Sequence, residues 1–220
     1  FNLAYVRPSA TNWHHKVWYV VPADEAAAPA DTNWFVHFGL QTKLMQSWMA
    51  EDQLRAGNGR VTFYPELDAS NNVNVGLLVL SQTRAQAEAL GGGSMYGQIW
   101  NQIPAAYKDS THKNVTFTTV AYAALGGGDL AYVGAYQNFL PDRASDIMAK
   151  LLSTTTYGSD SLTFATYCGV TLHEMVHCIH SIWHDFSANN VMGGAYDISQ
   201  YFTLTYSAAN LTPHNESSAA

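Results

Sequence analysis

Two histidines and a glutamate in the last quarter of the chain are the residues best placed to do chemistry. His173 and His177 are four residues apart, so on an α-helix both imidazoles project from one face and can bind one metal ion. Glu174 follows His173 and is turned by about 100° around the helix. Its carboxylate leaves the coordination position of its neighbour free and can reach a water at the ion. This H-E-x-x-H pattern predicts Zn²⁺ held by two imidazoles, with Glu174 as general base.

The sequence around the pattern decides whether it indicates a metal site, because a chance match is expected in about one of a hundred sequences of this composition. The segment lies in a predicted helix, Leu162–His177 and beyond, whose apolar flanks are typical of a buried helix. These flanking residues are Val170, Leu172, Met175, Val176 and Ile179. The alternative is a pair of core histidines bonded to the backbone. A glutamate between them would then also need a buried partner, which favours the metal site.

A catalytic zinc needs a third protein ligand and one position left open for water. His180 and His184 follow the pattern, and Asp185 is a rival because carboxylates also complete zinc sites. Asp197 is a further acidic candidate downstream. We interpret His180 as a residue of the helix end or of the surroundings of the site.

The segment 173–192 resembles the metzincin peptidases, whose pattern H-E-x-x-H-x-x-G-x-x-H precedes a turn with a methionine beneath the metal. His180 stands where the family has glycine, and His184 comes one residue late. Met192, in Asn190–Gly194, follows His184 by eight residues, the spacing of the matrixin branch. The resemblance implies His184 as third ligand and Met192 as the turn residue. Some branches of the family use a tyrosine to stabilise an oxyanion, a role in which Tyr196 is the candidate here.

The predicted elements before the motif also fit that family. The expected strands are 16–21, 61–64, 73–80, 114–123 and 130–136. The expected helices begin at caps among residues 31–33 and run to about 52, occupy part of 85–107 with a break at 91–93, and cover 141–152, 162–177 and 198–206. Asp160 or Ser161 is the expected cap of the motif helix. By the resemblance, Leu130–Tyr136 is the edge strand along which an extended substrate pairs.

We therefore expect an α+β fold of the zincin or metzincin kind, with a mixed twisted sheet, an active-site helix and a smaller, irregular C-terminal subdomain. One catalytic domain is expected over residues 1–220, because a chain of this length can build a sizeable core. Its upper subdomain would cover 1–177. Its lower subdomain, with the methionine turn and a terminal helix, would cover 178–220.

The composition excludes several classes of function. A chain that is 47% hydrophobic and only 12% charged is not disordered. A formal net charge of -7, with ten scattered basic residues, argues against a nucleic-acid partner. No apolar run approaches the roughly 18 residues that span a bilayer. We expect a monomer that acts on a protein or peptide substrate.

Other features favour a secreted, extracellular protein. The chain opens at Phe1 without a signal-like segment, which is typical of a mature form. Three glycosylation sequons begin at Asn114, Asn210 and Asn215. Cys168 and Cys178 would lie about 15 Å apart on one helix, too far for a disulfide, so we predict two buried free thiols.

The sequence thus predicts a zinc-dependent endopeptidase in which Glu174 takes a proton from water and passes it to the leaving amine. One alternative is a non-catalytic zinc-binding or adhesive module, which would have no need of Glu174. Another is a zinc peptidase of a different clan, with Asp185 or Asp197 as third ligand.

Overall fold

The computed structural model describes residues 13–27, 33–55, 57–118, 120, 124–134 and 159–180. Within these ranges the strands are β1 (His14–Val21), β2 (Val75–Val79), β3 (His112–Thr118), β4 (Ala124–Gly127) and β5 (Leu130–Val133). The α-helices are α1 (Trp34–Arg55), α2 (Arg84–Gln102) and α4 (Ser159–His180). Two short 3-10 helices, η1 (Ala23–Glu25) and η2 (Ala105–Tyr107), flank the first and third strands.

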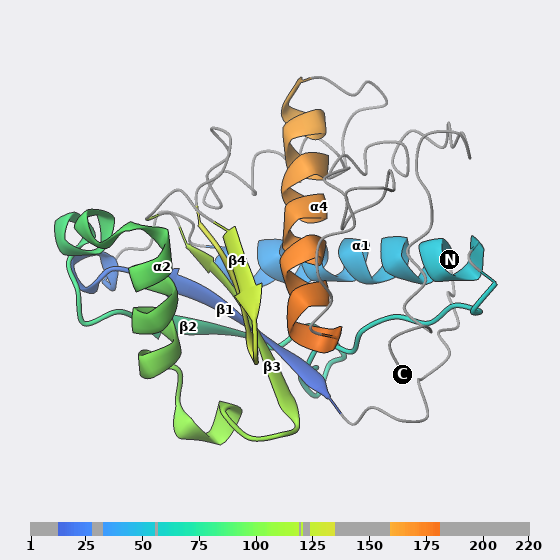
Figure 1. Ribbon diagram of the computed structural model, residues 1–220, viewed down its shortest axis with the longest axis horizontal. Helices are drawn as coiled ribbons and strands as arrows, with labels where there is room; N and C mark the ends of the chain where they lie inside the picture. The colour runs from blue at the N-terminus through green and yellow to red at the C-terminus, as the bar shows by residue number, and fades with distance from the viewer. Residues whose placement is uncertain are drawn as a thin grey trace.

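The five strands form one mixed sheet in the order β2-β1-β3-β5-β4. β1 runs parallel to β2 and β3, and β3 runs parallel to β5. Only β4, at one end of the sheet, is antiparallel to its neighbour. Figure 1 shows α1 and α4 crossing on one side of the sheet and α2 on the other. The predicted α+β class with a mixed sheet is confirmed.

The central strand β1 is buried on both faces, as its position between two helical layers requires. Val17, Tyr19 and Val21 pack with α1 and α4, whereas Trp18 and Val20 pack with α2. Two aromatic rings, those of Phe38 on α1 and Phe117 on β3, stack with centroids 4.8 Å apart. The core is therefore divided by the sheet into two apolar layers.

The start and the bend of α2 have local causes, whereas the predicted caps of α4 do not lie at its start. Thr83 caps α2 by accepting a hydrogen bond from the backbone N–H of Gln86, and the Gln86 side chain accepts one from the Thr83 N–H. Gly91 has φ of 70° and kinks α2, in agreement with the break predicted at the glycine triplet. α4 begins at Ser159, so Asp160 and Ser161 lie inside the helix and are not its caps.

Most predicted elements in the described ranges are confirmed with shifted ends, but two predictions are wrong. Residues 61–64 form no regular strand: Pro65, which follows, makes one isolated bridge to His15 and has no N–H to extend a ladder. The strand predicted at 130–136 is not an edge strand, because β5 lies between β3 and β4. The helices predicted at 141–152 and 198–206 lie outside the described residues.

The sequon that begins at Asn114 is also misread from the sequence. Asn114 is fully buried: its amide nitrogen donates to the Tyr107 carbonyl oxygen at 2.8 Å, and its side-chain oxygen accepts from Trp18 Nε1 at 2.9 Å. The folded chain therefore cannot carry a glycan there. Asn210 and Asn215 lie outside the described residues.

Candidate metal centre

α4 brings His173 and His177 together on one of its faces. The Nε2 atoms of the two rings are 3.1 Å apart, and the ring planes meet at 89°. His173 is buried and His177 is half-buried. The remaining faces of the helix secure this placement, since Cys168, Leu172 and Met175 pack into the core against α1 and the sheet.

The distance between the two nitrogens fits one shared zinc ion. Two imidazole nitrogens at the usual bond length from a tetrahedral zinc lie about 3.4 Å apart. Without an ion, one ring N–H can donate to the other ring. One ligand atom each from His173, Glu174 and His177 lies within 4.8 Å of the others, and no second group of this kind occurs among the described residues. The donor set therefore supports a metal site at this turn of α4.

A carboxylate oxygen of Glu174 lies within 4.8 Å of a ring nitrogen of each histidine, and β4 of the sheet packs against the same residue. Its side chain is buried, and this burial raises the pKa of its carboxyl to about 7. The backbone N–H of Gly126 on β4 donates to the carboxylate and lowers the pKa in part. A cation held by the two histidines would favour the ionised form further. The Glu174 carboxylate is thus a candidate proton acceptor beside the two imidazoles.

The contact between β4 and α4 was not predicted, although it fixes the surroundings of Glu174. A Cβ atom at Gly126 would lie 2.2 Å from the Glu174 carbonyl oxygen, so only glycine allows this approach. The triplet Gly126–Gly128 was the available signal. Two of its glycines, Gly126 and Gly127, belong to the edge strand β4 itself.

The predicted third ligand and its neighbours fall beyond α4. His184, Asp185, Met192, Tyr196 and Asp197 all lie outside the described residues. The backbone of His180 ends α4. Both cysteines, Cys168 and Cys178, are buried free thiols on α4, as predicted.

Three solved structures similar to this one are structures of the protein OgpA. Wild-type OgpA from Akkermansia muciniphila matches in two crystal forms, with TM-scores of 0.64 and 0.60 and sequence identities of 15% and 14%. A catalytically inactive OgpA bound to an O-glycopeptide substrate, glycodrosocin, matches with a TM-score of 0.63 and 12% identity. The chain shares the fold of OgpA.

The extent of the match is unequal for the two proteins. These matches cover 89%, 96% and 83% of this chain, but only 57%, 58% and 51% of the OgpA chains. The chain therefore spans a little over half the length of OgpA. No family model matches the sequence, and no curated protein matches it.

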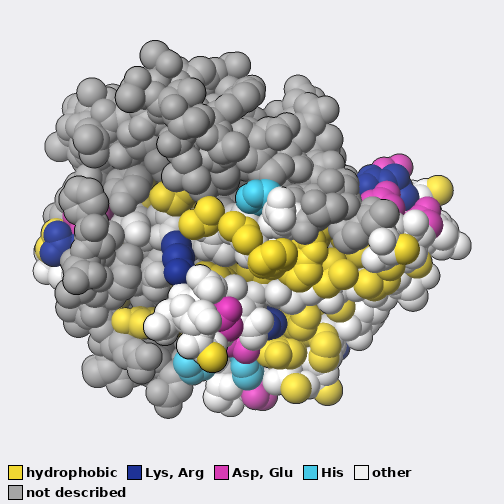
Figure 2. Space-filling model, turned by 180° about the vertical axis from the view of Figure 1, so that it is seen from behind, with side chains coloured by type: hydrophobic (Ala, Val, Ile, Leu, Met, Phe, Trp, Pro, Cys, Tyr) yellow, Lys and Arg dark blue, Asp and Glu magenta, His cyan; other side chains and the backbone are white. Residues whose placement is uncertain are grey.

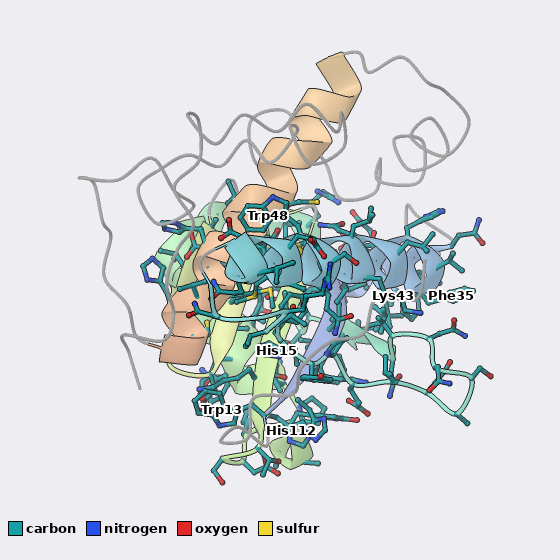
Figure 3. The ribbon with its side chains drawn as sticks, turned by 90° about the vertical axis from the view of Figure 1, so that its right-hand side faces the viewer. Trp13, His15, Phe35, Lys43, Trp48 and His112 are labelled. Atoms are coloured by element: carbon teal, nitrogen blue, oxygen red, sulfur yellow. The ribbon has the colours of Figure 1, made fainter. Side chains whose placement is uncertain are left out.

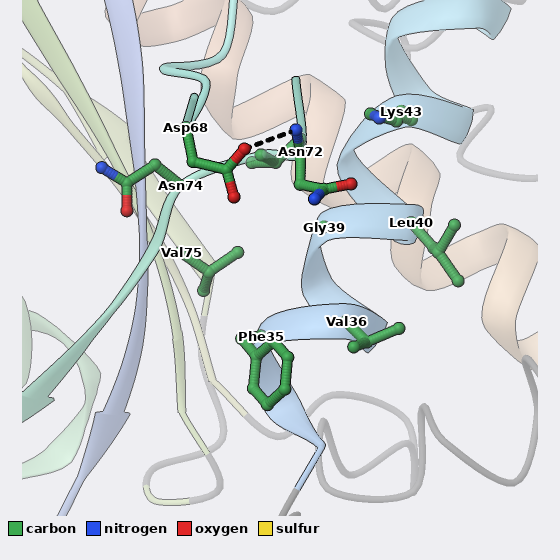
Figure 4. Close-up of a pocket in the computed structure, with 10 residues that line it drawn as sticks. Phe35, Val36, Gly39, Leu40, Lys43, Asp68, Asn72, Asn74 and Val75 are labelled. Atoms are coloured by element: carbon green, nitrogen blue, oxygen red, sulfur yellow. Dashed lines mark hydrogen bonds between the residues drawn. The ribbon is translucent and has the colours of Figure 1, made fainter. Parts of the chain in front are cut away.

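A groove lies apart from the metal centre, between the start of α1 and the turn before β2. It has a volume of about 310 Å³ and is lined by Phe35, Leu40 and Lys43 on one side and by Asp68 and Asn72 on the other (Figure 4). The Asn72 backbone N–H donates to Asp68 Oδ1 at 2.9 Å and shapes the turn. The groove shares no residue with the metal centre.

The surface around α1 is apolar over a wide area. From behind, hydrophobic side chains form a band across the described part of the surface (Figure 2). Phe35, Val36 and Leu54 of α1 are among the exposed large hydrophobic residues. No helix in the described ranges combines the length and the apolar character needed to cross a bilayer.

Proposed function

We propose that this chain is the single catalytic domain of an extracellular, zinc-dependent endopeptidase of metzincin type. The observation that carries the proposal is the pair of imidazole nitrogens 3.1 Å apart on α4, with the buried Glu174 carboxylate beside them. The shared fold with OgpA, whose inactive form binds a peptide substrate, supports it. The proposed domain covers residues 1–220, divided after His177 into an upper and a lower subdomain.

Each residue has a defined part in the proposed reaction. His173, His177 and His184 would hold the zinc ion, with Met192 in the turn beneath them. When bound, zinc supplies a Lewis acid that activates water and polarises the scissile carbonyl. Glu174 takes the proton from the attacking water and delivers it to the leaving amine. Tyr196 is proposed to donate to the developing oxyanion.

The proposed substrate is an extended peptide that pairs with the free edge of β4. Among the described strands β4 pairs with β5 alone, so its other edge carries no strand there, and the Gly126 N–H on β4 is already donated to Glu174. Because the inactive OgpA was captured with an O-glycopeptide, we propose peptides with O-glycosylated Ser or Thr as the substrate class. A pair of peptides with one sequence, with and without the glycan, tests this preference.

Replacing Glu174 by Gln separates a peptidase from a zinc-binding module. We expect Glu174→Gln to retain zinc but to cleave at least about 1,000-fold more slowly, because the general base is lost. Glu88→Gln is the matched control, since Glu88 is exposed on α2 and pairs with Arg84. Unchanged cleavage in Glu174→Gln would contradict the proposed role of this residue.

The third ligand is tested by zinc content. His184→Ala should lose most of its bound zinc, whereas Asp185→Ala and Asp197→Ala should keep it. His14→Ala is the control for removing a histidine, because His14 is exposed at the start of β1. Loss of zinc in an aspartate variant and not in His184→Ala would place the protein in a different clan of zinc peptidases.

A further inference from the structure

β4 touches α4 backbone to backbone at Gly126. A Cβ atom at this position would meet the carbonyl oxygen, carbonyl carbon and Cα of Glu174 at 2.2, 2.8 and 2.9 Å. Gly126 is not among the glycines with positive φ, so the position needs glycine for space and not for its backbone conformation. The same residue donates its N–H to the Glu174 carboxylate. Gly126 thus meets both the backbone and the side chain of the proposed general base.

The next residue of β4 is tied to two helices through its carbonyl oxygen. The Tyr96 hydroxyl on α2 donates to Gly127 O at 2.6 Å. The Cys178 thiol on α4 lies 3.9 Å from the same oxygen and 3.2 Å from the Glu174 carbonyl oxygen. Burial raises the pKa of Tyr96 to about 12 and that of Cys178 to about 12, so both groups keep their protons at neutral pH. Figure 1 shows β4 between α2 and α4, where these contacts hold it.

We propose that Gly126 and Gly127 of β4 position the Glu174 carboxylate, and that Tyr96 is a positioning residue that acts through β4. The inference rests on the proposed function, because it assigns these residues to the same reaction. A free glutamate side chain samples several rotamers, and the Gly126 N–H selects one of them. Tyr96 keeps that N–H in place without touching the reacting atoms.

The kinetic test compares two glycine substitutions of equal size. Gly126→Ala should lower kcat by about 10- to 100-fold, because a small misplacement of a reacting group has an effect of this order. Zinc content should change less than about twofold, since the metal ligands are not altered, whereas KM is not diagnostic for this variant because the substrate is proposed to pair with β4. Gly97→Ala on α2, where no described atom lies within 4 Å of the added Cβ, should keep wild-type kcat.

Tyr96→Phe is a second test of the inference, which remains available if Gly126→Ala does not fold. It removes one hydroxyl and should lower kcat about 3- to 10-fold at unchanged KM and zinc content. Wild-type kcat in Tyr96→Phe, or a loss of activity that follows only the loss of zinc, would overturn the inference.

A second readout does not depend on activity. In the metal-free protein, the Gly126 amide should exchange its hydrogen slowly, and Glu174→Ala should speed this exchange at least about tenfold because the acceptor is gone. The exposed control Glu88→Ala should leave the exchange of Gly126 unchanged. An unchanged rate in Glu174→Ala overturns the inference even if the wild-type protein cleaves peptides. Absence of cleavage with the expected exchange pattern overturns the proposed function instead.

Discussion

Acid should destabilise the metal-free fold through His15, which is buried on the face of β1 that packs against α1. Its Nδ1 lies 3.3 Å from the Tyr64 carbonyl oxygen and donates to it, whereas Nε2 has no hydrogen-bond partner among the described residues. In Figure 3 His15 lies below α1, between Trp48 and His112. Burial lowers the pKa of His15 from 6.5 to about 4, because the buried ring loses the water that would solvate its charge.

The pKa difference fixes both the sign and the size of the effect. The unfolded chain binds a proton at His15 near pH 6.5 and the folded chain only near pH 4, so the free energy of unfolding falls as the pH falls between these values. Between about pH 7.5 and about pH 4.5 the loss is about 2.5 kcal/mol. The raised pKa of Glu174 acts in the opposite direction and stabilises the metal-free fold as the pH falls.

A comparison of variants isolates the contribution of His15 from that of Glu174. Urea unfolding of the metal-free wild type and of His15→Gln at the two pH values measures the free energy of unfolding. On acidification, His15→Gln should lose about 2.5 kcal/mol less than the wild type, because glutamine does not titrate. The exposed control His14→Gln should follow the wild type. Equal pH dependence of the wild type and His15→Gln would refute the reasoning.

Three further predictions concern packing, glycosylation and metal binding. Gly76→Ala should reduce the free energy of unfolding by about 1–3 kcal/mol, because the new Cβ would lie 2.5 Å from the Trp18 ring. Chemical unfolding of this variant and of the control Gly97→Ala measures the effect. Similar free energies of unfolding for the two variants would contradict the prediction. In a host that glycosylates, Asn114 of the folded protein should carry no glycan, because its side chain is buried. Detection by mass spectrometry of a glycosylated peptide that contains Asn114 would contradict this burial. Removing zinc with a chelator should lower the thermal midpoint of the wild type but not that of His173→Ala, and an equal shift in both would place the ion elsewhere.

The candidate metal centre could be located from the sequence because the placement of its two histidines is local. The four-residue spacing of His173 and His177 is enough to place both rings on one helical face, and the apolar flanks predict that this helix is buried. The same holds for the break in α2, where Gly91 adopts the positive φ that glycine allows. In each case the deciding interaction lies within one element.

The edge of the sheet could not be predicted, because its features depend on contacts between distant segments. β4 has the sequence Ala-Leu-Gly-Gly, which lacks the alternating β-branched residues of a typical strand. The need for glycine at position 126 arises from Glu174, 48 residues later in the chain. Asn114 illustrates the same point, since its burial follows from its contacts with Trp18 and Tyr107 and not from its sequon.

Peptide cleavage followed through removal and return of zinc tests the central claim most directly. The purified protein should contain about one zinc ion and cleave a glycosylated peptide, lose cleavage when a chelator removes the ion, and regain it when zinc is restored. His173→Ala should neither bind the ion nor recover. Cleavage that persists in protein shown to be metal-free, or zinc bound equally by the wild type and His173→Ala, would contradict the account.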